Sequence, residues 1–216
     1  VNQHFYHGMP YQPKGTDTID FFATTYFGPG GSLTQELPAF NAYMEKVSGL
    51  MQRGKTYSDV AVYIPYEDGV MKGAYPPERQ RVWVWGEYEL RYIHPPEEIA
   101  GYHPLWINRH FLMQAEFKNG KLVVGDAAFS TLYIDVEYMD VRTLMRILEL
   151  AQEGLQVCLK RRPKRPGHLK AETYDHLITE LLALRNVSGN FNAVTDHPPL
   201  IQGDSLPGYW CRVEED

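Results

Sequence analysis

The stretch from residue 121 to residue 160 constrains the fold of this chain more than any other. Residues 121–125 and 130–134 are short apolar runs rich in β formers, and an Asn-Gly turn precedes the first of them. Apolar side chains then recur at the i, i+3, i+4, i+7 spacing of one helical face, at Val141, Leu144, Met145 and Leu148. Gly154 follows as a helix-ending residue, and residues 155–159 form another apolar run.

This order of strand, helix and strand with short joints predicts a βαβ crossover, in which the two strands run parallel. Residues 59–65 form a further apolar run closed by a proline, as expected for a strand buried on both faces. Helices are predicted at 38–51, 104–115 and 171–184, and a last strand at 186–191. The sequence therefore predicts an α/β domain with a mainly parallel sheet and an irregular N-terminal segment.

Composition excludes several classes of protein. The chain has 216 residues, 44% hydrophobic and 22% charged, as in ordinary soluble globular proteins. Its net charge of −6 argues against a general nucleic-acid binder, which usually has a basic face. No apolar run reaches the roughly 18 residues of a membrane span. Two cysteines are too few for a disulfide framework, and a chain beginning at Val1 is expected to be a mature protein or a piece of a longer one.

Two features near the end of the central stretch have competing interpretations. Residues 160–165 form a basic cluster, which we interpret as a solvated loop, the alternative being a contact with phosphate or a partner. Cys158 lies inside an apolar strand and is followed by Leu-Lys-Arg, without the glycine of a sharp nucleophile turn. We therefore expect Cys158 to be a small core residue rather than a nucleophile.

The sequence carries few of the known catalytic patterns. No Gly-Xaa-Ser-Xaa-Gly turn and no Gly-Xaa-Gly-Xaa-Xaa-Gly dinucleotide motif follows a predicted strand. The acidic pairs at 67–68, 97–98 and 214–215 are interpreted as solvated faces, because adjacent carboxyls do not supply the spacing that glycoside hydrolysis needs. Residues 186–188 match an N-glycosylation acceptor, a pattern that also arises by chance.

The first residues of the chain supply the candidate binding groups. His4, Tyr6, His7 and Tyr11 lie in a segment rich in aromatics, glycine and proline. On a strand, His4 and His7 would face opposite sides, so they do not form a simple metal clip. They are interpreted either as loop histidines held by local hydrogen bonds or as groups that bind sugar hydroxyls. No catalytic, cofactor-binding or metal-binding residue is assigned.

Several short motifs occur in a characteristic order. They are His4-Phe5-Tyr6-His7-Gly8-Met9-Pro10-Tyr11, Phe27-Gly28-Pro29, Leu37-Pro38-Ala39-Phe40-Asn41-Ala42-Tyr43, the run at 59–65, Gly101-Tyr102-His103-Pro104 and Tyr209-Trp210-Cys211-Arg212. This order resembles the large α-L-rhamnosidases of glycoside hydrolase family 106 and similar bacterial glycosidases. In those proteins such a sequence leads from the exit of the catalytic (β/α)8 barrel into a flavodoxin-like domain. That domain resembles a class I glutamine amidotransferase without its nucleophile.

The resemblance implies a division of the chain. Residues 1–35 would be an irregular segment at the barrel exit, 36–191 a three-layer flavodoxin-like α/β domain, and 192–216 a linker with a terminal strand. His4, Tyr6, His7 and Tyr11 would border the sugar pocket. No catalytic acid or nucleophile is carried over, because the barrel that holds these residues and a calcium ion in the family is not in this sequence.

Two functions from different classes follow. The first is a non-catalytic domain of a large carbohydrate-active glycoside hydrolase, with a scaffolding, interface or site-shaping role. Its partners would be carbohydrate through the parent enzyme, other domains of the same chain and a homo-oligomer, without nucleic acid or membrane, and it would have no cofactor of its own. The resemblance implies a periplasmic or secreted location. The alternative is a free-standing flavodoxin-like module that binds a small ligand beside the loops after Ile64 and Ile134.

Overall fold

The computed structural model describes residues 35–71, 95–167 and 172–214. Contacts divide the chain into two units, one of residues 1–54 with 212–216 and one of residues 55–211. In the first unit, the described elements are helix α1 (Leu37–Gln52) and the short strand β10 (Arg212–Val213). None of the side chains of α1 is buried. The guanidinium of Arg212 donates to the carbonyl oxygens of Arg53 and Gly54, so the residues after α1 are held within this unit.

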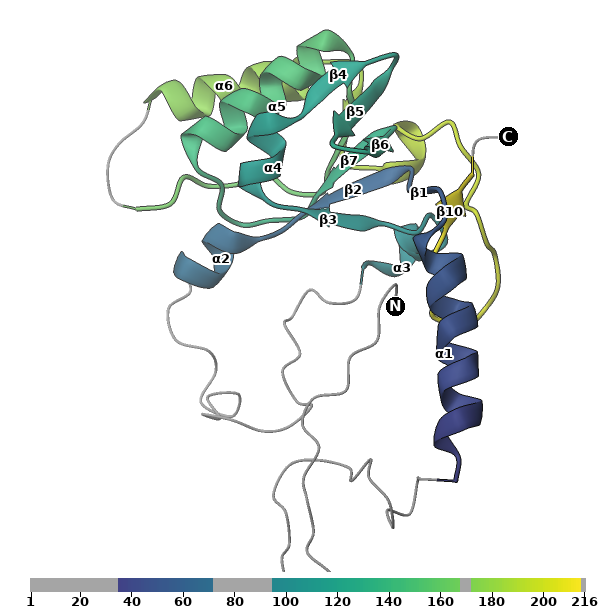
Figure 1. Ribbon diagram of the computed structural model, residues 1–216. Helices are drawn as coiled ribbons and strands as arrows, with labels where there is room; N and C mark the ends of the chain where they lie inside the picture. The colour runs from purple at the N-terminus through teal and green to yellow at the C-terminus, as the bar shows by residue number, and fades with distance from the viewer. Residues whose placement is uncertain (1–34, 72–94, 168–171, 215–216) are drawn as a thin grey trace, which may run out of the picture. The chain divides into compact units, whose positions relative to one another are not determined.

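The second unit is built on a five-stranded parallel sheet (Figure 1). Its strands, in chain order, are β2 (Val60–Tyr63), β3 (Leu105–Ile107), β7 (Thr131–Ile134), β8 (Gln156–Leu159) and β9 (Val187–Ser188). In space they lie in the order β3-β2-β7-β8-β9. Numbered along the chain, this order is 2-1-3-4-5, which is the flavodoxin-like order. The predicted α/β class and the parallel pairing of β7 with β8 are therefore confirmed.

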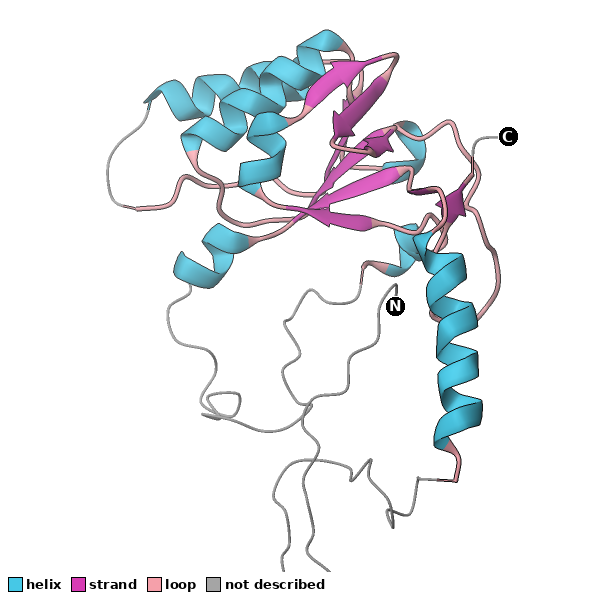
Figure 2. Cartoon of the chain, in the orientation of Figure 1, coloured by secondary structure: helices cyan, strands magenta, loops and turns pink. Residues whose placement is uncertain are grey.

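The remaining elements surround this sheet (Figure 2). The helices are α2 (Tyr66–Met71), α3 (Glu97–Ala100), α4 (Arg109–Gln114), α5 (Val141–Glu153), α6 (Glu172–Ala183) and the 3-10 helix η2 (Phe191–Ala193). A separate antiparallel sheet contains β4 (Glu116–Lys118), β5 (Lys121–Val124) and β6 (Ala127–Phe129), and β1 (Lys55–Thr56) precedes β2.

Both faces of the central strands are buried, and the period of two along each strand explains how. Ala61, Tyr63, Leu132 and Ile134 belong to the core shared with α4, α5 and α6. Their neighbours Val60, Val62, Tyr133 and Cys158 belong to a second core with α3 and η2. Alternate side chains of a strand point to opposite faces, so one strand contributes to both cores. The result is a sheet between two helical layers.

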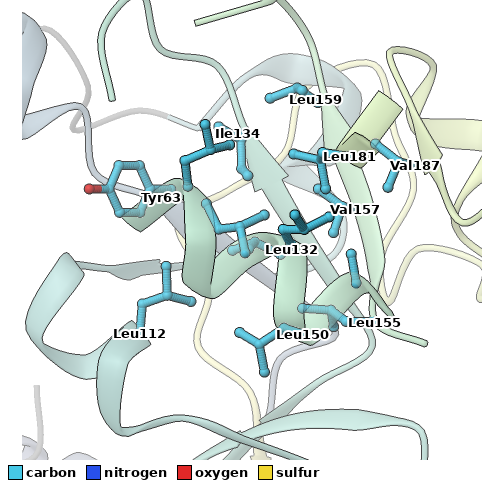
Figure 3. Packing of buried hydrophobic residues seen from close by; sticks show 14 of the residues in the cluster. Tyr63, Leu112, Leu132, Ile134, Leu150, Leu155, Val157, Leu159, Leu181 and Val187 are labelled. Atoms are coloured by element: carbon cyan, nitrogen blue, oxygen red, sulfur yellow. The ribbon is translucent and has the colours of Figure 1, made fainter. Parts of the chain in front are cut away.

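The larger core is mostly aliphatic and includes the buried rings of Tyr63, Phe129 and Tyr174. Figure 3 shows the side chains of Leu132, Ile134, Val157 and Leu181 close to one another. The ring of Tyr63 lies at the margin of this group, with its hydroxyl directed away from the aliphatic side chains (Figure 3). Tyr63 is fully buried, so its hydroxyl needs a hydrogen-bond partner inside the protein.

One predicted element is wrong. Residues 104–115 do not form a single helix: Leu105–Ile107 is strand β3, and helix α4 begins only at Arg109. The side chain of Asn108 accepts a hydrogen bond from the backbone N–H of Phe111 and so caps α4. Phe111 on α4 is 48% exposed. The β formers at 105–107 pair with β2 instead of entering a helix.

Candidate functional site

The strand order marks one place where a ligand of a flavodoxin-like fold would bind. The chain leaves β2 first toward β3 and later returns on the other side as β7. Ligands of such sheets bind outside the carboxyl ends of the strands, at this reversal of order. The loops that follow β2 and β7, residues 64–68 and 135–140, are therefore the candidate site.

Asp68 ties these two loops together. Its carboxylate accepts hydrogen bonds from the backbone N–H groups of Glu137, at 3.0 Å, and Tyr138, at 2.7 Å. The side chain is almost fully buried, at 2% exposure. A buried carboxylate is stable only when donors surround it, and paired backbone amides are good donors for an anion. These two backbone N–H groups thus already have an acceptor that the protein itself supplies.

Glu67, the neighbour of Asp68 on α2, is also turned inward. Its carboxyl accepts a hydrogen bond from the hydroxyl of Tyr63 at 3.2 Å and is influenced by the carboxyl of Asp140. Burial and the influence of Asp140 raise the pKa of Glu67. The exposed side of this short helix carries Tyr66 and Val70, which are 69% and 61% exposed. Helix α2 therefore has its acidic residues inside and its apolar residues outside.

Asp140 is the N-cap of α5 and is surrounded by donors. One carboxylate oxygen accepts from the backbone N–H groups of Arg142 and Thr143, at 2.9 and 3.1 Å. The other accepts from the Thr143 hydroxyl, at 2.5 Å, and faces the guanidinium of Arg109 at 3.4 Å. Burial alone would raise the pKa of Asp140, but the hydrogen bonds from Thr143 and Glu67 and the charge of Arg109 lower it below its ordinary value.

A second polar group lies at the ends of β7 and β8. The hydroxyl of Tyr133 donates to Glu98 at 2.6 Å, and the ammonium group of Lys160 lies 2.9 Å from the same oxygen. Burial raises the pKa of Glu98, but these two donors lower it further than burial raises it. Burial and the adjacent Glu98 raise the pKa of Tyr133 far above its ordinary value. The arrangement is a neutral phenol, a carboxylate and an ammonium group, which together can bind hydroxyl groups.

The basic cluster at 160–165 is engaged with acidic partners. Lys160 pairs with Glu98, Arg161 lies 2.5 Å from Asp135, and Arg162 lies 3.2 Å from Asp175. The side chains of these pairs are partly or largely exposed to water, so each pair contributes little to stability. These contacts agree with the interpretation of this stretch as a solvated loop.

Cys158 is buried within β8 and packs in the core that contains Tyr133 and Phe191. Burial raises the pKa of its thiol to about 12, because the charged thiolate is disfavoured away from water. The strand continues through Leu159, so Cys158 does not stand on a sharp turn. The expected core position of this residue is confirmed, and a thiol in this environment is a poor nucleophile.

The structure bears on two interpretations made from the sequence and overturns the first of them. The pair Glu67-Asp68 is not a solvated face, since both side chains are buried at the candidate site. The acceptor pattern at 186–188 is not an accessible glycan site, because the amide nitrogen of Asn186 donates to the carbonyl oxygens of Ala151 and Leu155 at 2.8 and 2.6 Å. Both donor hydrogens of the amide are thereby used.

The predicted sugar-contacting residues His4, Tyr6, His7 and Tyr11 lie outside the described residues, and their role stays a prediction. The carboxyls of Glu67, Asp68 and Asp140 were missed as a group. The available signal was their position: each follows a predicted strand by a few residues, and the carboxyl ends of parallel strands meet at one edge. Within the described parts of the chain, no helix is long and apolar enough to cross a membrane.

No protein-family model, curated protein or solved structure matches the chain.

Proposed function

We propose that this chain is a non-catalytic α/β domain of a large carbohydrate-active glycoside hydrolase, α-L-rhamnosidase-like, in which it serves as a scaffold, an interface or one wall of the sugar site. The proposal starts from the resemblance in motif order between this chain and family 106 enzymes. Within that proposal the α/β domain is amidotransferase-like, without a nucleophile. Hydrolysis would belong to polypeptide outside these 216 residues.

The bond between Asp68 and the loop after β7 is the observation that carries the proposal. It supplies an acceptor to backbone N–H groups at the edge where the ligands of flavodoxin-like domains bind, with a carboxylate oxygen 2.7 Å from the backbone nitrogen of Tyr138. A domain that uses its own side chain there has no need of a ligand to complete its fold. The poor nucleophilicity of the buried Cys158 supports the same conclusion.

Hydrolysis of an aryl α-L-rhamnoside tests this function. The chain of 216 residues is expected to release no aryl alcohol, while the protein made from the whole encoded reading frame is expected to hydrolyse the substrate. Turnover by the 216-residue chain alone would refute the assignment as non-catalytic. A whole-frame protein that is inactive on a panel of aryl glycosides would refute the assignment to a glycoside hydrolase.

The alternative, a free-standing small-ligand-binding module, has one specific observation in its favour. Glu98, Tyr133 and Lys160 place a carboxylate, a phenol and an ammonium group together at the carboxyl ends of β7 and β8. Such a set binds sugar or nucleotide hydroxyls. Titration calorimetry with a panel of sugars and nucleotides distinguishes the two functions. Saturable heat that is lost in Lys160→Ala favours the module, and an absence of heat with every ligand favours the non-catalytic domain.

A further inference from the structure

Helix α2, which follows β2 at the carboxyl edge of the sheet, presents a small apolar surface to water (Figure 1). Tyr66 and Val70 are 69% and 61% exposed, and Ile64 and Met71, at the two ends of this stretch, are each 36% exposed. Tyr66 and Val70 are four residues apart, so they lie side by side on one face of the helix. Since the helix is only about 9 Å long, one partner can cover all four side chains, which we name the α2 surface.

The acidic residues on the opposite face fix the orientation of α2. The carboxylate of Asp68 accepts from the backbone N–H groups of Glu137, at 3.0 Å, and Tyr138, at 2.7 Å, while Glu67 accepts from the hydroxyl of Tyr63 at 3.2 Å. Both acidic side chains are buried. Rotation of α2 to bury its apolar side chains would leave two backbone N–H groups without their acceptor. The fold therefore holds the α2 surface outward.

Gly69 lies on the same outward face, three residues after Tyr66. It is exposed, and a Cβ atom added to it would meet no other atom within 4 Å. Its φ is not positive, so the backbone here does not need glycine, and alanine would be the more stable residue in a helix. Close approach of a partner's backbone to α2 gives the missing side chain a use.

The size of the α2 surface decides between two kinds of partner. Its four side chains expose about 400 Å², so a contact over them would bury about 800 Å² on both partners together. Stable complexes of separate chains bury about 1,200–2,000 Å². Domains of one chain form contacts of about 600–1,500 Å², because their linker keeps the partner at a high effective concentration. The area therefore fits a neighbouring domain of the same polypeptide and is too small for a stable dimer of this chain.

We propose that the α2 surface is the docking face for another domain of the same polypeptide, one that presents an apolar surface and brings its backbone close to Gly69. This inference rests on the proposed function, in which these 216 residues are one domain of a larger glycoside hydrolase, and it places the interface of that domain at α2. The same contact would act on the loop after β7, because Asp68 joins α2 to that loop.

Hydroxyl-radical footprinting, with peptide mass spectrometry, measures this contact. The 216-residue chain is compared with the protein made from the whole encoded reading frame. Tyr66 and Val70 are expected to be modified about fivefold more slowly, or slower still, in the longer protein, because the centre of an interface excludes water. Phe111 on α4 is 48% exposed and serves as the control, with the same modification rate expected in both proteins.

Gly69→Gln changes the α2 surface without touching the acidic contacts. In the 216-residue chain it should unfold at the urea concentration of the parent or a higher one, since the new side chain enters open space. In the longer protein it should return the modification rate of Val70 to that of the 216-residue chain, because the added side chain keeps the partner away. Glu97→Gln, at an exposed position on α3, is the matched control and should leave Val70 protected.

Equal modification of Tyr66 and Val70 in the two proteins would overturn the proposal. Equal protection of Phe111 would overturn it as well, since the longer polypeptide would then shield the whole unit. A 216-residue chain that sediments as a dimer with Tyr66 protected would make a second copy the occupant and refute the proposal.

The footprint does not depend on hydrolysis, so the two proposals can fail separately. A longer protein that protects Tyr66 but hydrolyses no aryl glycoside would support the docking face and refute the glycoside hydrolase. An active longer protein with Tyr66 unprotected would do the reverse. A reading frame that encodes no further domain would overturn both.

Discussion

The phenol of Tyr133 donates a 2.6 Å hydrogen bond to the carboxylate of Glu98, a residue 35 positions away in the chain. Tyr133 is in the middle of the sheet, and Glu98 lies in the first turn of the short helix α3 that covers one face of it. A charged acceptor makes such a bond stronger than one between neutral groups. This contact connects the end of β7 to the covering layer of the sheet and gives the first prediction.

Tyr133→Phe should destabilise the chain by about 1.5 kcal/mol, the typical value for a hydrogen bond to a charged group. Urea unfolding at neutral pH measures the loss. Lys160→Ala removes only a partly exposed ion pair with Glu98, so its effect should stay below about 1 kcal/mol. An equal loss in the two variants would mean that Glu98 is held by its surroundings rather than by the phenol.

Asp68→Ala should be among the most destabilising single substitutions in the second unit. It leaves the backbone N–H groups of Glu137 and Tyr138 without their acceptor and should cost about 3 kcal/mol. Asp68→Asn keeps one oxygen and should cost about half of that. Asp126, which is exposed in the turn before β6, provides the matched control, and Asp126→Ala should unfold at the same urea concentration as the parent chain.

Asp140→Asn tests the acid side of the stability curve. The folded-state pKa of Asp140 lies below its ordinary value of 3.8, so its contribution is present above that value and is lost as the pH falls through the lowered one. Asparagine also caps helices, so the cap of α5 should survive the change. Unfolding free energies between about pH 2 and pH 5 should fall less steeply in the variant than in the parent chain. If the unfolding free energy of the variant falls with pH as steeply as that of the parent, other carboxyls cause the loss of stability in acid.

The two cysteines should differ in reactivity. Cys158 is fully buried with a thiol pKa of about 12, while Cys211 is partly accessible. Treatment of the native chain with a maleimide at about pH 8 should modify Cys211 alone, and Cys158 should react only after unfolding in urea. Peptide mass spectrometry assigns the modified residue, and early modification of Cys158 would contradict its burial.

Asn186 should carry no glycan when the chain is secreted from a eukaryotic cell, because its amide is used in two hydrogen bonds. Asn186→Asp replaces the donor by an acceptor that faces two carbonyl oxygens and should cost about 2 kcal/mol. Ser188→Ala removes the acceptor pattern but leaves the two hydrogen bonds of Asn186 in place. The variant should therefore match the parent chain in stability, and its mass should show no loss of a glycan. Detection of a glycosylated Asn186 peptide would refute the assignment.

The central stretch was predictable because several local signals agree there. Helix α5 begins after Asp140 and ends at Glu153, and Gly154 has the positive φ, 118°, that its position requires. Strands β7 and β8 fall inside the predicted apolar runs. Local propensity and hydrophobic period were sufficient for these elements.

The sequence predictions were wrong or incomplete where tertiary contacts determine the structure. Residues 105–107 have an ambiguous period, and only their pairing with β2 makes them a strand. The candidate site could not be assembled from sequence for a related reason. Asp68 and Tyr138 are 70 positions apart, and their hydrogen bond arises from the order of the strands in the sheet.

The reversed polarity of α2 has a practical consequence for anyone who redesigns this protein. A hydropathy scale would mark Glu67 and Asp68 as water-facing positions open to substitution, and Tyr66 and Val70 as positions to preserve. The opposite rule should hold here: engineering for solubility belongs at Tyr66 and Val70, whose side chains project from the surface, while the two acids next to them should be left unchanged.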